Sequence, residues 1–571
     1  MRITALGGIF CLFLGSVCLA QTTCEVKQEE PLRLMGKELT RNIKVLKKQK
    51  PPVYYLAYTY QQQDRLWLNA SFGNVEVQQR EERFGDVIAR AGSKVLDNTR
   101  ALKGEREDFT VSSRSQMPFP SADNPKAFER VWWGLTEQAA KEAQKRYSAV
   151  LSHSRTMTQT KDPSDDFVFP PQETFCQTQT EPEIDIEVVK KLLAAAAQLP
   201  QGKKYVFDYN VAFSYTRGHR YFADSRGTRL KTPYAYMRLS YELVNYTQDG
   251  MELTRFKDYN VSSIEQLPTQ EQLRADITQS LAELEQLTNA PEGEPFTAPT
   301  ILKGKAAAVF VHEVLGHRLE GHRQKNESEG QTFTGKVGQL VISPLLTIVD
   351  DPTLQTFQGK TLRGHYVYDE EGVKARPVSL IENGVLKNFL MSSSPIQNFA
   401  ASNGHGRKET GRRAVARMGI MRTTSSETVP YEELEKKLLE EIKRQGKPYG
   451  FIVEDLGGGF TFTGKSMPQS FKLETKLIWR VYPDGRKEMV RGLDIVGTPL
   501  VSFNRVLAVG DDDTIFDGSC GAESGWVPQT NIAPSLLLEA LETERTQTSP
   551  WKLPLLVSPA QEAAQKKGGT K

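Results

Sequence analysis

AAAVFVHEVLGH, residues 306–317, joins an apolar run to a pair of histidines and a glutamate. The alanine-rich, apolar composition predicts a buried helix from roughly Lys305 to His317. In the related H-E-x-x-H motif, two histidines one turn apart bind zinc and the glutamate acts as a general base. His312 and His317 are therefore candidate metal ligands, and Glu313 is the candidate base.

The spacing of the two histidines differs from that motif, because His312 and His317 are five residues apart. On a regular helix, five residues correspond to a separation of about 140° around the axis. Two ligands of one metal must face the same side. The sequence therefore predicts that the helix bends, tightens or ends near Gly316, a residue type that tolerates such a change.

A regular helix would allow a different grouping of ligands. Glu313, His317 and Glu320 are spaced i, i+4 and i+7, so they would share one face and could form a carboxylate–histidine–carboxylate site. His322 is a further candidate nearby. A simple polar helix face is the ordinary alternative, but three of the seven histidines in the chain lie in this short segment. The clustering favours a metal site.

A catalytic zinc usually has three protein ligands and one open position, so a ligand from elsewhere is required. Cys520 lies in the sequence Asp517-Gly-Ser-Cys-Gly521, with a glycine close on each side. Such glycines let the backbone approach another group closely. Cys520 could be the third ligand, although a small buried cysteine is a common alternative.

The N-terminus, residues 1–20, is predicted to be a signal peptide cleaved after Ala20. Arg2 supplies the positive start, and the apolar run from Leu6 to Leu19 is shorter than the ~20 residues of a spanning helix. An uncleaved membrane anchor is the alternative. No other stretch is apolar enough to span a bilayer. We therefore expect an exported protein, periplasmic or secreted, without a stable membrane span.

Three cysteines remain after removal of that segment, namely Cys24, Cys176 and Cys520. Cys24 and Cys176 could pair in an oxidising compartment, which leaves Cys520 as the odd thiol.

The acidic and basic residues of the chain are nearly balanced, with a formal net charge of +3, so the overall charge does not indicate nucleic-acid binding. The basic cluster Arg407, Arg412, Arg413 and Arg417 is expected to be a solvated face, with a clamp for a substrate carboxylate as the alternative.

The length of 571 residues is too great for one core and predicts several domains. The division expected is an N-terminal α+β domain at 21–290, a β-rich domain at 291–548 carrying the metal helix, and a disordered tail at 549–571. In the first domain, helices are expected at 31–50, 128–151, 184–197 and 270–287, strands at 53–60, 66–77 and through 205–259, a turn at 217–219, and a loop at 162–181. In the second, a helix is expected at 431–445, with strands at 345–349, 365–368, 378–381 and 477–481.

From about Leu302 to Leu541, the sequence resembles the TldD/PmbA family of zinc metallopeptidases, in what looks like an exported variant. Several separate stretches match in order. They are HEVLGHRLEGH at 312–322, FTGKVG at 333–338, TIVDD at 347–351, LIENGVL at 380–386, Gly406-Arg407, Arg417-Met418, the glycines at 457–459 and GSCG at 518–521. The N-terminal half, from Cys24 to about Ala290, matches only loosely. His322 stands where the family usually has an acidic residue, and Trp526 replaces a smaller one.

This resemblance implies that His312, His317 and Cys520 bind Zn²⁺ and that Glu313 is the general base. It implies an α+β fold, with an N-terminal α/β domain and a C-terminal antiparallel β-rich domain that carries the metal-binding helix. The expected activity is hydrolysis of peptides or unfolded segments held as an added β-strand. The expected assembly is a homodimer, or a heterodimer with a PmbA/TldE-like subunit. A non-catalytic, peptide-binding partner of that kind is the alternative function.

Overall fold

A computed structural model describes residues 21–102, 118–156, 162–179, 182–465, 470–498 and 503–547, with residues 556 and 562. The predicted signal peptide at 1–20 and nearly all of the predicted tail lie outside these ranges. Among the described residues, no helix is both long and apolar enough to cross a membrane. The fold is α+β, as predicted, with helices set against extended, mainly antiparallel sheets.

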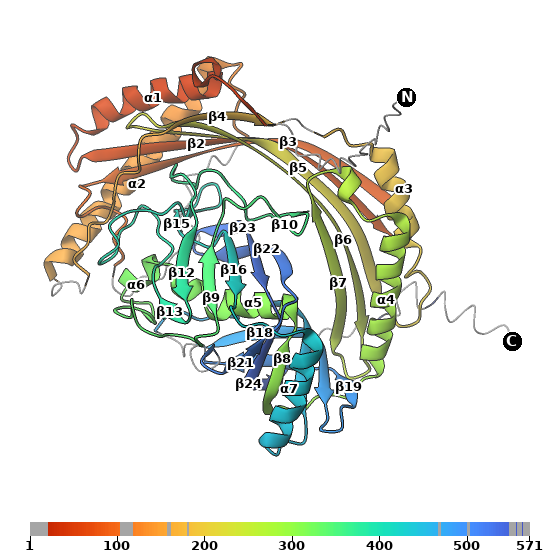
Figure 1. Cartoon of the computed structure of the whole chain (residues 1–571). Coiled ribbons are helices and arrows are strands. Elements are labelled where there is room, and N and C mark those ends of the chain that lie inside the picture. The colour runs from red at the N-terminus through yellow and green to blue at the C-terminus, as the bar shows by residue number, and fades with distance from the viewer. Residues whose placement is uncertain are drawn as a thin grey trace, which may run out of the picture.

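The N-terminal half forms one sheet of seven strands. They are β1 (Gln21–Thr23), β2 (Val53–Ser71), β3 (Asn74–Ala91), β4 (Thr174–Gln179), β5 (Asp208–Asp224), β6 (Arg229–Tyr246) and β7 (Glu252–Val261). The order is β1-β4-β6-β5-β2-β3, with β7 also paired to β6, and only β4 and β6 run parallel. In Figure 1 the long strands form an arch, and the C-terminal half of the chain lies on its concave side.

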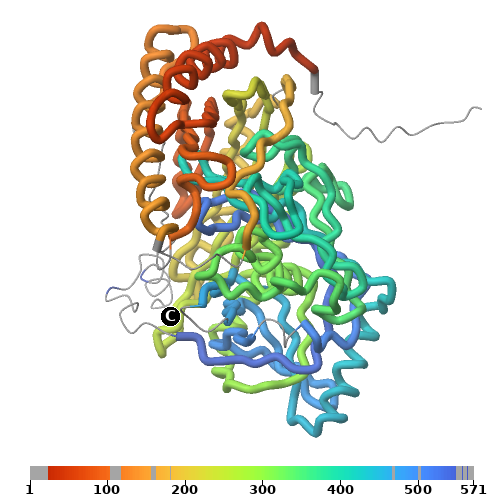
Figure 2. The backbone as a smooth tube through the Cα atoms, turned by 90° about the vertical axis from the view of Figure 1, so that its left-hand side faces the viewer, coloured from red at the N-terminus to blue at the C-terminus, as the bar shows by residue number. Residues whose placement is uncertain are grey.

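Helices cover the convex face of this arch in two pairs. They are α1 (Glu30–Leu46) with α2 (Pro125–Thr156) at one end, and α3 (Ile186–Ala197) with α4 (Gln270–Asn289) at the other. Figure 2 shows α1 and α2 running side by side. Every second residue of β2 faces these helices, because side chains alternate along a strand. Leu56 and Tyr58 pack under the first pair, and Leu66 and Leu68 under the second.

Three local predictions in this half are wrong. The strands expected at 53–60 and 66–77 are one continuous strand, β2, and the second range runs across the hairpin turn at 72–73 into β3. The expected loop at 162–181 contains strand β4, and the expected turn at Arg217-Gly218-His219 lies inside β5. Gly218 allows β5 to pack closely against β2, since a Cβ at this position would overlap the carbonyl oxygen of Gln62 on β2. The actual turn follows Asp224, whose carboxylate accepts three backbone N–H bonds from residues 226–228.

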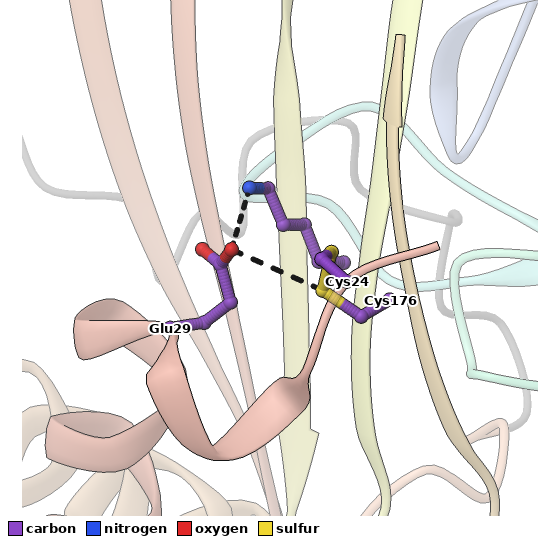
Figure 3. The surroundings of a disulfide bond; sticks show 4 residues. Cys24, Glu29 and Cys176 are labelled. Atoms are coloured by element: carbon purple, nitrogen blue, oxygen red, sulfur yellow. Dashed lines mark hydrogen bonds and ion pairs between the residues drawn. A yellow bond between two sulfur atoms is a disulfide. The ribbon is translucent and has the colours of Figure 1, made fainter. Parts of the chain in front are cut away.

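A disulfide between Cys24 and Cys176 ties the start of the described chain to the sheet (Figure 3). The backbone N–H of Cys24 also donates to the carbonyl of Cys176 at 3.1 Å. Beside the disulfide, Lys231 on β6 donates to Glu29 at 2.8 Å. The bond links residues 152 positions apart in the sequence. Disulfides of this kind persist in oxidising compartments and are rare in the cytosol.

The described part of the C-terminal half contains two large sheets, two two-stranded sheets and three helices. The strands are β8 (Thr297–Leu302), β9 (Thr347–Asp350), β10 (Thr356–Phe357), β11 (Lys360–Thr361), β12 (Val378–Glu382), β13 (Val385–Leu386), β14 (Gly406–Arg407), β15 (Val415–Ala416), β16 (Ile420–Thr424), β17 (Gly450–Thr461), β18 (Phe471–Val481), β19 (Lys487–Val490), β20 (Leu493–Gly497), β21 (Val506–Val509), β22 (Thr514–Ala522), β23 (Gly525–Ala533) and β24 (Leu536–Arg545). The helices are α5 (Gly304–Val314), α6 (His322–Lys325) and α7 (Tyr431–Arg444), and 3₁₀ turns occur at Val26–Gln28, Ile264–Gln266 and Gly316–Leu319. The strand expected at 365–368 is not formed, since Tyr368 makes only an isolated bridge with Lys374.

The two large C-terminal sheets enclose α5. One has the order β13-β12-β9-β16-β23-β22, and the other has the order β17-β8-β24-β20-β18-β19, with β21 on β24. Pairing is antiparallel except for β16 with β23 and β8 with β17. Helix α5 packs against β17 on one side and against β22 and β23 on the other (Figure 1). Every residue of α5 except Lys305 is buried, so the apolar run of the sequence lies in the core between the sheets.

Buried ion pairs join the C-terminal half to the arch. Lys408 contacts Asp86 of β3 at 2.7 Å, and both side chains are almost fully inaccessible to solvent. Arg255 of β7 contacts Asp455 of β17 at 2.9 Å. Buried charges of this kind are costly to separate, because removing one partner leaves the other uncompensated. The two halves are therefore held in a fixed relation around the concave face.

Candidate metal centre

Three side chains of metal-ligating type meet at one end of α5. His312 Nε2 lies 3.1 Å from Cys520 Sγ, and His317 Nε2 lies 3.4 Å from the same sulfur. All three residues are buried. A tetrahedral zinc with Zn–N near ~2.0 Å and Zn–S near ~2.3 Å separates such ligand atoms by about 3.5 Å. The donor set and its spacing therefore fit one zinc ion with a position left for water.

The helix ends where the histidine spacing requires it to end. Helix α5 stops at Val314, and a 3₁₀ turn begins at Gly316, which confirms the predicted break. Only glycine fits at position 316, because a Cβ there would overlap the sulfur of Met418. The tighter turn rotates His317 toward His312, with ring centroids 5.0 Å apart. The alternative site on a regular helix face is not formed, because that face does not continue beyond Val314.

Cys520 reaches the histidines from a distant part of the sequence. It lies on β22, the edge strand of its sheet, opposite Val527 of β23. Side chains alternate along β22, so Cys520 shares a face with Thr514, which packs against Gly304 at the start of α5. The strand thus presents the thiol to the helix.

Each histidine is oriented through its second ring nitrogen. Asn531 Nδ2 lies 3.1 Å from His312 Nδ1, and the Asn531 oxygen is buried without a partner. Amide N and O are assigned from the hydrogen-bond network, and exchanging them would let the oxygen accept the Nδ1 proton and leave Nε2 free for a metal. His317 Nδ1 lies 3.1 Å from Glu320, which is fully buried. Sequence reasoning missed both roles. The three-residue spacing from His317 to Glu320 was a signal, whereas nothing local pointed to Asn531.

The charges around the thiol favour its ligating form. Burial alone raises the pKa of Cys520, but His312, His317 and Arg417 lower it to well below its ordinary value of 9.0. The reciprocal effect acts on His317: burial lowers its pKa, while Cys520 and Glu320 raise it to about 10, which favours the protonated ring, so metal binding at this histidine requires release of a proton. A thiolate is the form of cysteine that binds metals, so the pocket holds Cys520 ready for coordination.

Glu313 lies beside the ligands rather than among them. The ligand group contains His312, His317 and Cys520 and does not include this carboxylate. Its neighbour across the site is Gly459 of β17, where a Cβ would lie 3.0 Å from Glu313 Cγ. The glycine therefore lets a strand pass close to the carboxylate. A base next to a metal-bound water requires this kind of position.

The glycine-rich part of β17 has an open edge. On one side, residues 450–461 pair with β18. On the other side, pairing with β8 stops at Val453, and no strand among the described residues pairs with 454–460. Unpaired main-chain N–H and C=O groups on such an edge can bind an extended chain.

The other residues that the sequence analysis singled out are not among the three clustered metal ligands. His322 contacts Glu523 at the tip of the β22–β23 hairpin and lies outside the His312–His317–Cys520 group, but together with Glu320 and Glu523 it forms a second cluster of ligand-type side chains. The expected solvated arginine face is wrong for Arg407 and Arg417, which are 4% and 0% exposed. Trp526 is 66% exposed and covers Gly521, on the face of the hairpin opposite to Cys520.

Comparisons with known proteins connect the C-terminal half with metallopeptidases. Residues 295–545 match the family described as PmbA/TldA metallopeptidase C-terminal domain. A metalloprotease TldD homolog of Haemophilus influenzae is 27% identical over 270 residues, covering 46% of this chain and 51% of that protein. A metalloprotease of Methanocaldococcus jannaschii is 27% identical over 359 residues, covering 61% and 72%. The chain spans about half the length of the first of these relatives.

The fold itself extends over most of the chain. The crystal structure of TldE from Thermococcus kodakarensis superimposes with a TM-score of 0.58 at 14% identity, covering 89% of this chain and 99% of that one. At such low identity the likeness concerns the fold alone. Together, the matched domain and the relatives named as metalloproteases show that residues 295–545 carry the C-terminal domain of the PmbA/TldA metallopeptidases, while the shared fold extends over most of the chain.

Proposed function

We propose that this protein is a zinc-dependent peptidase that hydrolyses peptides or unfolded protein segments. The observation that carries the proposal is the convergence of His312, His317 and Cys520 with Glu313 beside them. A bound zinc would supply a Lewis acid for the peptide carbonyl and a water of lowered pKa. The Glu313 carboxylate is placed to accept a proton from the attacking water and to pass it to the nitrogen of the leaving amine as the peptide C–N bond breaks.

The two strands that border the site support binding of substrate as an added β-strand. The free edge of β17 at 454–460 runs past Glu313, and β22, which carries Cys520, is itself an edge strand. An extended segment beside either edge forms main-chain hydrogen bonds, which bind without selecting side chains. A folded substrate does not offer such a free main chain. This argues for unfolded segments as the substrate class.

Removal of the metal tests the proposed activity. We expect one zinc per chain in the purified protein, cleavage of a reduced and alkylated unfolded protein, and loss of cleavage after dialysis against a chelator. One equivalent of zinc should restore the activity. Metal analysis and gel or mass-spectrometric digestion assays measure these outcomes. A protein that folds but neither holds zinc nor cleaves would instead be a non-catalytic, TldE-like partner that presents peptides.

We also propose that the protein is exported and that its subunits pair, with themselves or with a PmbA/TldE-like subunit. The disulfide between Cys24 and Cys176 supports export, because such bonds form in oxidising compartments. The intact mass of protein from the periplasm or medium should correspond to a chain that begins at Gln21. A chain that retains residues 1–20 in the cytosol would contradict export. The mass of the same sample in solution measures the pairing.

A further inference from the structure

The metal ligands come from segments that are far apart in the sequence, so something must fix their relative position. His312 and His317 belong to α5 and the turn after it, whereas Cys520 lies 208 and 203 residues later on the β22–β23 hairpin. A shift of the hairpin by a fraction of an ångström would change the metal–sulfur distance. Metal sites accept deviations of only about 0.2 Å in such distances.

Arg417 lies between the two segments. Its Nη2 donates to the carbonyl oxygen of Cys520 at 2.8 Å, and its Nη1 donates to Ser524 Oγ at 2.8 Å. Its Nε lies 3.3 Å from the Glu320 carboxylate, which in turn contacts His317. The arginine is fully buried. One guanidinium therefore touches the backbone of the cysteine ligand and the carboxylate that orients a histidine ligand.

A second guanidinium makes a parallel connection. Arg323 donates through Nε to Glu320 at 2.7 Å and through Nη2 to Glu523 at 2.9 Å. Glu523 lies at the tip of the hairpin and also contacts His322. Glu320 is thus linked to the hairpin twice, through Arg417 at one carboxylate oxygen and through Arg323 at the other. We call Glu320, Arg323, Arg417 and Glu523 the buried clasp.

Resting on the proposed function, we propose that the buried clasp positions the metal ligands, with Arg417 as its central positioning residue. A planar guanidinium holds several acceptors in fixed directions at once, which an ammonium group cannot do. Lysine in place of Arg417 would keep the charge but could not span Cys520, Ser524 and Glu320 together. The hairpin would then move relative to His317, and the sulfur would leave its ligating position.

Replacement of Arg417 by lysine tests this inference through metal binding alone. We expect zinc affinity, measured by competition with a chromophoric chelator, to fall ~10- to 100-fold, the range found for residues that orient metal ligands. In the cobalt-substituted protein, the thiolate-to-cobalt charge-transfer absorption should weaken or shift. Circular dichroism and thermal unfolding check that the variant is folded.

The matched control is Arg90→Lys. Arg90 is also buried and is ion-paired with Asp97 at 2.9 Å, but it lies on β3 of the N-terminal sheet, and its partner belongs to the same half of the chain. The Arg90→Lys variant should be less stable than wild type, but its zinc affinity and the spectrum of its cobalt form should be unchanged. If Arg417→Lys does not fold, Glu523→Gln, at the partly exposed hairpin tip, should show the same type of loss.

Equal zinc affinity of wild type and the folded Arg417→Lys or Glu523→Gln variants would overturn the inference and leave the proposed function standing. So would an equal loss in Arg90→Lys, because the effect would then be general destabilisation. A wild-type protein that binds zinc but cleaves nothing would overturn the proposed function and leave the inference intact. A wild-type protein without zinc affinity would overturn both.

Discussion

Glu313→Gln is expected to retain one zinc per chain and to cleave an unfolded protein ~10²- to 10⁴-fold more slowly than wild type. Glutamine keeps the size and shape of the side chain beside Gly459 but cannot accept the proton of a water. Because Glu313 is not one of the three clustered ligands, its replacement leaves the donor set complete. Initial rates of digestion and the zinc content of the same sample measure the two effects.

Glu435→Gln serves as the control for this experiment. Glu435 is a carboxylate on α7 that pairs with Lys487 of β19 at 2.6 Å, and neither element borders the metal centre or the proposed substrate edges. Its replacement should leave the rate close to that of wild type. Normal turnover by Glu313→Gln would exclude this residue as the base. Loss of zinc from Glu313→Gln would instead indicate a ligating role.

Cys520→Ser is expected to abolish stable zinc binding and, with it, peptide hydrolysis. The hydroxyl of serine stays protonated under conditions in which the Cys520 thiol is ionised, because the histidines and Arg417 lower the pKa of the thiol well below its ordinary value. The loss of affinity should exceed the ~10- to 100-fold typical of residues that only orient ligands. Metal analysis after gel filtration measures it.

A thiol assay accompanies this variant. Cys520 is the free cysteine of the described residues, so the unfolded, metal-free wild type that begins at Gln21 should present one reactive thiol and the variant none. Circular dichroism should show the same fold in both, since serine differs from cysteine by a single atom. A folded Cys520→Ser variant that keeps a full equivalent of zinc would contradict the assignment of the third ligand.

The part of the site that could be predicted from sequence is the part that is contiguous. His312, Glu313 and His317 occur in one short segment, and helix geometry alone required a break near Gly316. The reason for the break was not predictable, because Met418, which excludes a Cβ there, lies about one hundred residues later. Cys520 came from the family resemblance. The residue chemistry by itself left a buried structural cysteine open.

The wrong predictions for β4 and Arg417 have the same cause, namely contacts with residues far away in the sequence. Strand β4 has a polar sequence with weak strand character, and it is extended because β1 and β6 pair with it from either side. Arg417 reads as a surface residue in a basic stretch. It is buried because the hairpin and Glu320 supply acceptors that sequence spacing does not reveal. Local patterns predict elements well, whereas the partners of polar residues depend on the completed fold.

The separation of the ligands also sets the order of events when the protein is made. His312 emerges from the ribosome 208 residues before Cys520, so no shorter nascent chain contains a complete donor set. Contacts of such high sequence separation form late in folding, because the closure of long loops is entropically costly. If the site takes zinc as proposed, the metal meets its complete donor set only in a chain whose two C-terminal sheets are assembled. A metal that binds only this native state would stabilise it, so its supply would act as a final check on correct assembly.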